Sequence, residues 1–162
     1  LLTPATVALA VPLYEQFELL KKNIAAIIAG VTVGVLTSLG SVLGLAVLFG
    51  FSHEEYITFL PKSITTAIGM GVAEENGGIV PITVGVIIIT GVIGNMLGEL
   101  LLKLFRITEP VAKGIALGSS AHVMGTSKAM EIGEIEGAMS SLSVVVSGIL
   151  TVAAAALFAN FY

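Results

Sequence analysis

The stretch TEPVAKGIALGSSAHVMGTSKAMEIGEIEG, residues 108–137, decides how this chain folds. Between Lys113 and Lys128 it has 14 residues without a formal charge, which would extend roughly 20 Å as a helix. This run is too short to cross a hydrocarbon core of about 30 Å, yet it is too apolar for an aqueous loop. Broken backbone survives at membrane depth only where protein or a water-filled cavity satisfies its polar groups. We therefore predict that this stretch enters the membrane, breaks, and presents polar groups to a passing solute.

The composition of the whole chain is that of an integral membrane protein. Hydrophobic residues make up 56% and charged residues 11% of the sequence, against about 25% charged residues in ordinary soluble domains. No basic run is present that would attract nucleic acid. The sequence has no cysteine, two histidines and no HExxH pattern, so neither a catalytic site nor a metal centre is indicated. We expect a protein that is not an enzyme and that binds no metal, cofactor or nucleic acid.

Three long apolar runs, residues 23–52, 76–98 and 137–162, are predicted to span the bilayer. The first has 30 uncharged residues, or about 45 Å of helix, which suffices even for a tilted span. The expected fold class is an all-α polytopic membrane protein, in which three long transmembrane helices frame broken or re-entrant short helices. We treat residues 1–162 as a single transmembrane domain. Because the sequence does not start with methionine, we expect it to be the C-terminal part of a longer chain.

A second short segment, residues 59–78, has the same interrupted character as residues 108–137. Its sequence, FLPKSITTAIGMGVAEENGG, holds 11 uncharged residues between Lys62 and Glu74, again too few to cross the bilayer. Short or broken segments in corresponding positions are typical of internally repeated transporters. Chance similarity among segments rich in alanine, glycine and valine is the alternative explanation for the repeat.

The opening residues 1–16 are apolar but contain two prolines, which remove helical hydrogen bonds. They indicate either a kinked transmembrane helix or a broken segment whose freed carbonyls line a cavity. In the second case the cavity-lining residues are Pro4, Thr6, Pro12 and Tyr14.

Basic residues favour a topology in which residues 61–76 dip into the membrane and return. Lys21 and Lys22 precede the first long run, and Lys103 and Arg106 follow the second. The two pairs share a face only if residues 61–76 do not cross, and the positive-inside rule favours that arrangement. The shared face would then be cytoplasmic.

The candidate substrate-binding residues lie in the two short segments. A lysine at bilayer depth costs about 2.5–3.5 kcal/mol, so Lys62 and Lys128 either attract an anionic ligand or extend to the interface. Helix starts add partial positive charge and free N–H groups, and hydroxyl groups can donate hydrogen bonds to a carboxylate. These hydroxyls could equally satisfy carbonyls of their own helices. The hydroxyl candidates are Ser63, Thr65, Thr66, Ser119, Ser120 and Thr126.

Two further residues are candidates for moving a proton with the substrate. His122 lies inside an apolar stretch, and an imidazole with an ordinary pKa near 6.5 can carry a proton or contact the substrate. A histidine that only joins two helices by a hydrogen bond would look the same in the sequence. Glu131 lies three residues after Lys128, within pairing distance on a helix.

Three motifs together closely resemble the CidB/LrgB family of membrane proteins. They are PATVALAVPLY (4–14), LPKSITTAIGM (60–70) and KGIALGSSAHVMGTSKAMEIGEIEGAMSSL (113–142), and the similarity runs through all 162 residues. The sequence departs from the family pattern at Ala67, where members often have a proline after the paired threonines.

The resemblance implies two different functions. Bacterial members are described as antiholin-like or holin-like regulators of murein hydrolase export and autolysis, acting with a small holin-like membrane partner. A related plastid protein is a glycolate/glycerate translocator, and bacterial members have been linked to pyruvate uptake. Together with the broken segments, this favours a multi-pass carrier of small monocarboxylates in the bacterial cytoplasmic membrane. We expect it to be proton-coupled and to form a homo-oligomer, most simply a dimer, within the lipid bilayer.

Overall fold

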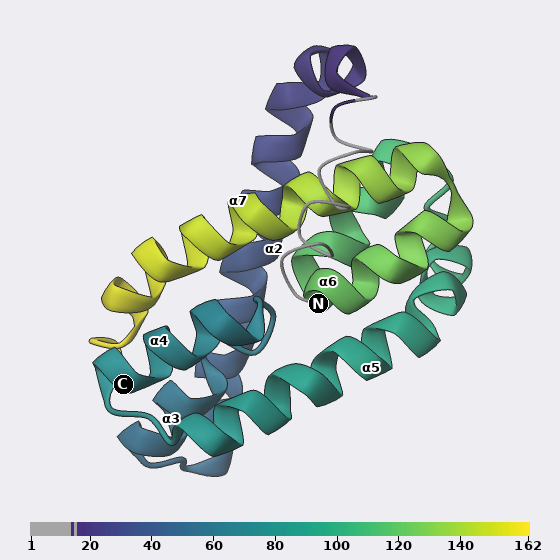
Figure 1. Cartoon of the computed structure of the whole chain (residues 1–162). Coiled ribbons are helices and arrows are strands. Elements are labelled where there is room, and N and C mark those ends of the chain that lie inside the picture. The colour runs from purple at the N-terminus through teal and green to yellow at the C-terminus, as the bar shows by residue number, and fades with distance from the viewer. Residues whose placement is uncertain (1–13, 15) are drawn as a thin grey trace.

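The computed structural model describes residue 14 and residues 16–162. Within that part the chain is helical and forms no strand (Figure 1). Its helices are α2 (Phe17–Phe49), α3 (His53–Phe59), α4 (Thr66–Asn76), α5 (Val80–Leu104), α6 (Pro110–Ile132) and α7 (Glu134–Phe158).

Three of these helices, α2, α5 and α7, are long and apolar enough to cross a membrane. This confirms the predicted all-α polytopic membrane fold, although each helix begins at a different residue from the predicted run. The first begins at Phe17 rather than at residue 23. The second begins at Val80, because Gly77 ends α4 with a φ of 85° and a proline occupies the first turn of α5. The third begins at Glu134, directly after Gly133.

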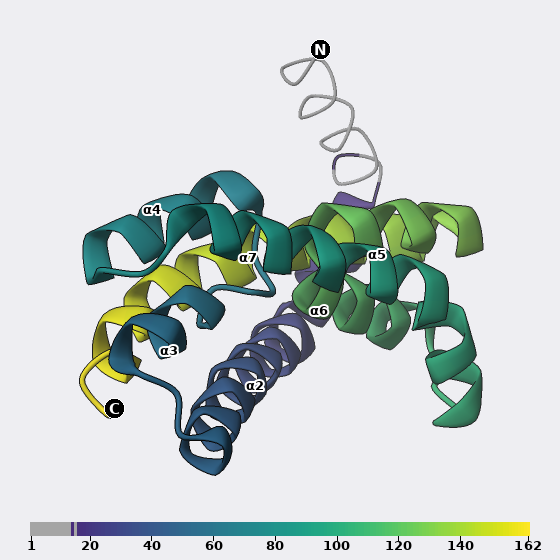
Figure 2. The same ribbon diagram turned by 90° about the horizontal axis from the view of Figure 1, so that it is seen from below.

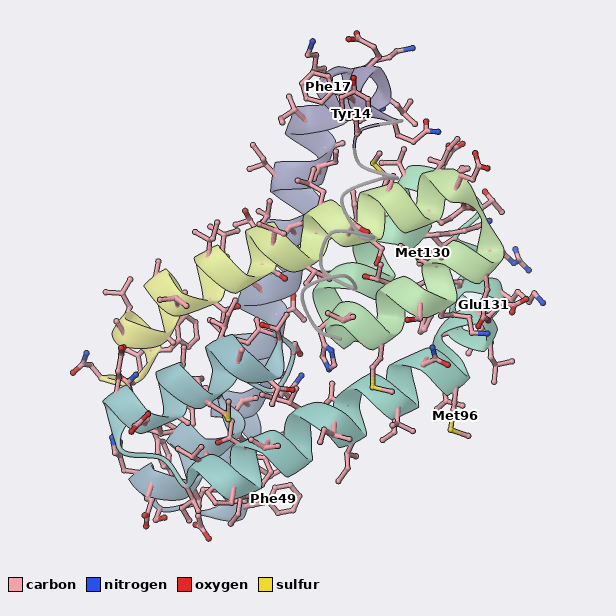
Figure 3. All side chains as sticks on the ribbon, in the orientation of Figure 1. Tyr14, Phe17, Phe49, Met96, Met130 and Glu131 are labelled. Atoms are coloured by element: carbon pink, nitrogen blue, oxygen red, sulfur yellow. The ribbon has the colours of Figure 1, made fainter. Side chains whose placement is uncertain are left out.

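The outer surfaces of the long helices are apolar, as contact with lipid requires. Phe49 at the end of α2 is 68% exposed and Met96 on α5 is 72% exposed. The Met96 side chain points away from the other helices (Figure 3). Buried side-chain nitrogen and oxygen atoms of the described residues all have hydrogen-bond partners, so the interior holds its polar groups without water. Polar groups inside and apolar groups outside are what a protein surrounded by hydrocarbon needs.

Helices α3 and α4, with the connecting residues 60–65, form an antiparallel pair that we call the first hairpin (Figure 2). A capping box starts α3, with the Ser52 side chain and the Glu55 side chain each bonded to the other residue's backbone N–H. Gly78, just after α4, lies so close to α3 that a Cβ atom there would be 3.1 Å from the Thr58 nitrogen. The chain therefore returns to α3 after α4 instead of continuing across.

Helix α6 is broken at its centre and forms the second hairpin. Ala121 and His122 have non-helical backbone angles, and His122 has a φ of 45°. Beyond the break, Gly125 packs on the carbonyl oxygen of Leu117, where a Cβ atom would overlap it. Only glycine permits this close approach of the two halves. The structure thus breaks residues 108–137 where the sequence predicts an interruption, and it returns the chain to the end where it entered.

The two hairpins enter the molecule from opposite ends. At one end Tyr162 donates a hydrogen bond to the Phe51 carbonyl at 2.6 Å, which joins the end of α7 to the start of the first hairpin. At the other end Lys113 and Glu136 form an ion pair at 3.5 Å, which joins the start of α6 to the start of α7. We call these the C-terminal end and the basic end. The basic end also holds the start of α2 and the last turn of α5 (Figure 1).

The chain therefore contains two units with the same sequence of elements, and the two units run in opposite directions. Helix α2 followed by the first hairpin is one unit, and α5 followed by the second hairpin is the other (Figures 1 and 2). Each consists of one long helix and one hairpin that enters from the end where that helix stops. Inverted units of this kind are typical of secondary transporters.

Candidate functional site

The tips of the two hairpins meet beside the middle of α2, around a cavity of about 330 Å³. We call it the tip cavity. Helix α2, the first hairpin and the second hairpin all contribute side chains to it. Its lining residues are Gly34, Thr37, Ser38, Ser41, Lys62, Ser63, Ser119 and Ser120.

Lys62 is the cation of this cavity. Its ammonium group donates hydrogen bonds to the hydroxyl oxygens of Ser38, at 3.1 Å, and Ser63, at 3.0 Å. Those two hydroxyls also lie 2.9 Å from each other. Among the described residues Lys62 has no carboxylate within ion-pairing distance. Since a lysine has three N–H donors, one remains for a ligand.

None of the side chains that line the tip cavity is acidic, and most of them carry a hydroxyl group. Ser119 and Ser120 currently donate to carbonyl oxygens of their own helix, at 2.7 and 2.6 Å. Each would have to rotate its hydroxyl to bind a ligand, which costs little because a serine hydroxyl reorients freely. The cavity therefore combines one positive charge with several adjustable donors.

Four of the predicted substrate-binding residues come together in this cavity, namely Lys62, Ser63, Ser119 and Ser120. Thr65 and Thr66 lie instead at the start of α4, outside the residues that line it.

His122 and Thr126 anchor the second hairpin to the long helices α5 and α7. His122 is buried, and its Nε2 atom lies 3.0 Å from the Ile87 carbonyl oxygen of α5. Thr126 donates to the His122 carbonyl at 3.1 Å, and its hydroxyl lies 2.8 Å from that of Ser140 on α7. His122 thus makes the helix-joining hydrogen bond that was the alternative to a proton-carrying role.

Lys128 is not brought to the cavity with Lys62. It forms an ion pair with Glu131, three residues further along α6, near the basic end. The hydrogen bond that the Lys128 ammonium group donates to this carboxylate raises the pKa of the ammonium group. The pairing matches the predicted spacing, but the structure separates the two lysines that were expected to share one anion site.

The predicted cavity-lining residues of the opening segment are not part of this site. Pro4, Thr6 and Pro12 lie outside the described residues. Tyr14 is 84% exposed and lies beside the start of α2 (Figure 3).

Sequence reasoning missed the contribution of α2, which supplies Thr37, Ser38 and Ser41. These residues were treated as part of an apolar span. A signal was nevertheless present, because Gly34, Ser38 and Ser41 recur at spacings of four and three, which puts them on one helical face. A polar stripe in the middle of a transmembrane helix indicates a neighbour other than lipid.

A second cavity, of about 580 Å³, connects the tip cavity to the basic end. The two cavities share Gly34 and Ser119. The second cavity follows the groove between α2 and the first half of α6 and reaches Asn23 and Glu109. Its length is lined mainly by small residues, which keep the groove open.

Toward the C-terminal end, Lys62 instead borders a small apolar cavity of about 150 Å³. Phe49, Phe51 and Phe59 line it, and the rings of Phe51 and Phe59 have centroids 5.4 Å apart. The tip cavity therefore continues to the basic end through a groove of mainly small and apolar residues, and aromatic rings border it on the opposite side.

These features define a class of protein: a helical membrane protein with two oppositely entering hairpins whose tips enclose a cationic, hydroxyl-rich cavity. Comparison with known families identifies it further. The family model described as the LrgB-like family matches residues 1–161. The chain belongs to the LrgB-like family, as its motifs indicate. No solved structure matches it.

Proposed function

We propose that this protein carries small monocarboxylates, such as pyruvate, glycolate or glycerate, across the cytoplasmic membrane of a bacterium. The observation that carries the proposal is the tip cavity, where Lys62 at the tip of the first hairpin faces the tip of the second and has no carboxylate partner among the described residues. Lys62 is half-buried, and a cation held away from water without a counter-ion is costly at membrane depth. An anionic substrate would supply that counter-ion and would thereby be selected.

The dimensions and donors of the cavity favour a small hydroxy or oxo acid. Its volume of about 330 Å³ is near the lower limit for ligand pockets. The carboxylate would pair with Lys62, and the neighbouring serines would donate to the carboxylate or to the 2-oxygen. Charge-assisted bonds of this type are about twice as strong as neutral ones. Substrates without a carboxylate would leave Lys62 unpaired and would be rejected.

The connected cavities support transport in preference to a purely regulatory role. A carrier must open its binding site to one side of the membrane at a time, and here the site is continuous with the basic end and closed by phenylalanines toward the other. Inverted units give such proteins two related states around one fixed site.

Uptake into proteoliposomes tests the proposal. Purified protein should accumulate labelled pyruvate or glycolate with saturation, and excess unlabelled substrate should compete. A pH gradient, acid outside, should accelerate uptake if the carrier is proton-coupled.

The rival function is regulation of autolysis through a small holin-like partner. Protein that is folded, as judged by helicity and a cooperative thermal transition, yet transports none of the three acids would favour this rival. Binding to the holin-like partner without any effect of substrate would favour it further.

A further inference from the structure

A cavity distinct from the tip cavity lies at the corner between α5 and α6, at the basic end. It has a volume of about 470 Å³, and we call it the corner cavity. Apolar side chains form its walls and charged ones form its rim. The lining residues are Glu99, Leu102, Lys103, Arg106, Ile107, Thr108, Lys113 and Ile132.

Three basic side chains lie on the rim of this cavity. Among the described residues, Arg106 is the one of the three that has no ion-pair partner. Lys103 pairs with Glu99 at 2.8 Å, and Lys113 pairs with Glu136 at 3.5 Å. Together the lining side chains carry three positive charges and one negative charge. The rim is therefore an anion-attracting surface with one guanidinium group free.

Arg106 occupies a backbone conformation that favours glycine over a residue with a side chain. Arg106 N–H bonds to the Lys103 carbonyl at 3.1 Å and Ile107 N–H bonds to the Leu102 carbonyl at 2.9 Å. This is the pattern of a helix C-terminus whose left-handed residue is usually glycine. Arg106 occupies that position with a φ of 55°, a conformation that a residue with a Cβ atom disfavours. A backbone requirement alone would select glycine.

The position of the cavity fits an amphiphilic ligand. The candidate span of α5 ends at Leu104, so Arg106 lies at the level of the lipid headgroups, and the apolar walls face the acyl region. We propose that the corner cavity binds an anionic phospholipid, with the headgroup phosphate on Arg106 and Lys103 and acyl chain atoms against Leu102 and Ile132. Free phosphate would leave those apolar walls in contact with water.

A single-tryptophan reporter tests the proposal, since the chain contains no tryptophan. Phe105→Trp is a conservative change at a side chain that is 70% exposed and adjoins Arg106. In mixed vesicles, brominated phosphatidylglycerol should quench this tryptophan more effectively than brominated phosphatidylcholine. One basic residue near an anionic headgroup changes the association constant about fivefold, and we expect a preference of at least that size.

Arg106→Gly, made in the reporter background, separates the lipid site from a structural role. Glycine relieves the left-handed conformation, so the melting temperature should stay unchanged or rise while the preference for phosphatidylglycerol falls about fivefold. Lys22→Gln is the matched control, because it removes an exposed cation at the same end that does not line the cavity. It should leave the preference unchanged.

Three results would overturn the proposal. The two brominated lipids could quench equally in the unmodified reporter protein. Lys22→Gln could lower the preference as much as Arg106→Gly, which would reduce the effect to general surface charge. Millimolar inorganic phosphate could displace phosphatidylglycerol, which would show a site for free phosphate instead of a lipid.

Discussion

Replacing Lys62 by methionine should strongly weaken substrate binding in the transport cycle and leave the fold intact. Methionine keeps a long unbranched side chain and removes only the charged donor. A hydrogen bond between charged groups contributes about 1.5–3 kcal/mol. Since about 1.4 kcal/mol is a factor of ten in an equilibrium constant, substrate affinity should fall about 10- to 140-fold.

The same structure indicates a small cost to stability. Once the ammonium group is gone, the Ser38 and Ser63 hydroxyls remain 2.9 Å apart and can still bond to each other. Neither hydroxyl is left without a partner, and Lys62 loses no ion pair that the described residues show. The melting temperature in detergent should therefore change by only a few degrees.

Initial uptake rates at several concentrations of labelled pyruvate or glycolate provide the assay. The apparent KM should rise by the factor given above. Lys128→Met is the matched control, since it removes a lysine that pairs with Glu131 away from the cavity. Unchanged KM in Lys62→Met, or an equal rise in both variants, would refute the assignment of Lys62 as the carboxylate-binding group.

Three further outcomes follow from the geometry. Gly91→Ala should destabilise the protein by about 1–3 kcal/mol through overpacking, because the new Cβ atom would lie 2.6 Å from the His122 ring, and it should also slow uptake. The control Gly85→Ala adds a Cβ atom in open space on the same helix. In thermal melts it should be neutral or stabilising by up to about 1 kcal/mol. Single cysteines at the outer ends of each hairpin should react with a membrane-impermeant thiol reagent from one face only, and the two hairpins should react from opposite faces. The positions are Glu54 and Glu75 for the first hairpin, and Glu109 and Glu134 for the second. Ala116→Phe should obstruct the groove to the basic end and lower the uptake rate. The control Ala67→Phe, at an exposed position on α4, should leave the uptake rate unchanged. Equal uptake rates in the two variants would contradict the proposed route.

The sequence predicted the membrane class and the interrupted segments well, because both depend on local composition. A run such as residues 114–127 is too short to cross hydrocarbon wherever it is placed. The candidate site was predicted only in part. Lys62 and Ser119 were both proposed, but the charge of Lys128 carried no information about its distance from Lys62. Sequence spacing along one helix does predict the pairing of Lys128 with Glu131.

The sequence by itself determined that three long helices frame two segments that cannot span, since hydrophobic length and charge are properties of the chain alone. Only the tertiary structure decided which polar groups meet. The break at His122 folds α6 back on itself and brings Ser119 to the middle of the molecule, where α2 presents Ser38 and the first hairpin presents Lys62. Such contacts depend on the crossing of helices far apart in sequence. No local pattern fixes that crossing, because close packing of small residues at many positions jointly selects it.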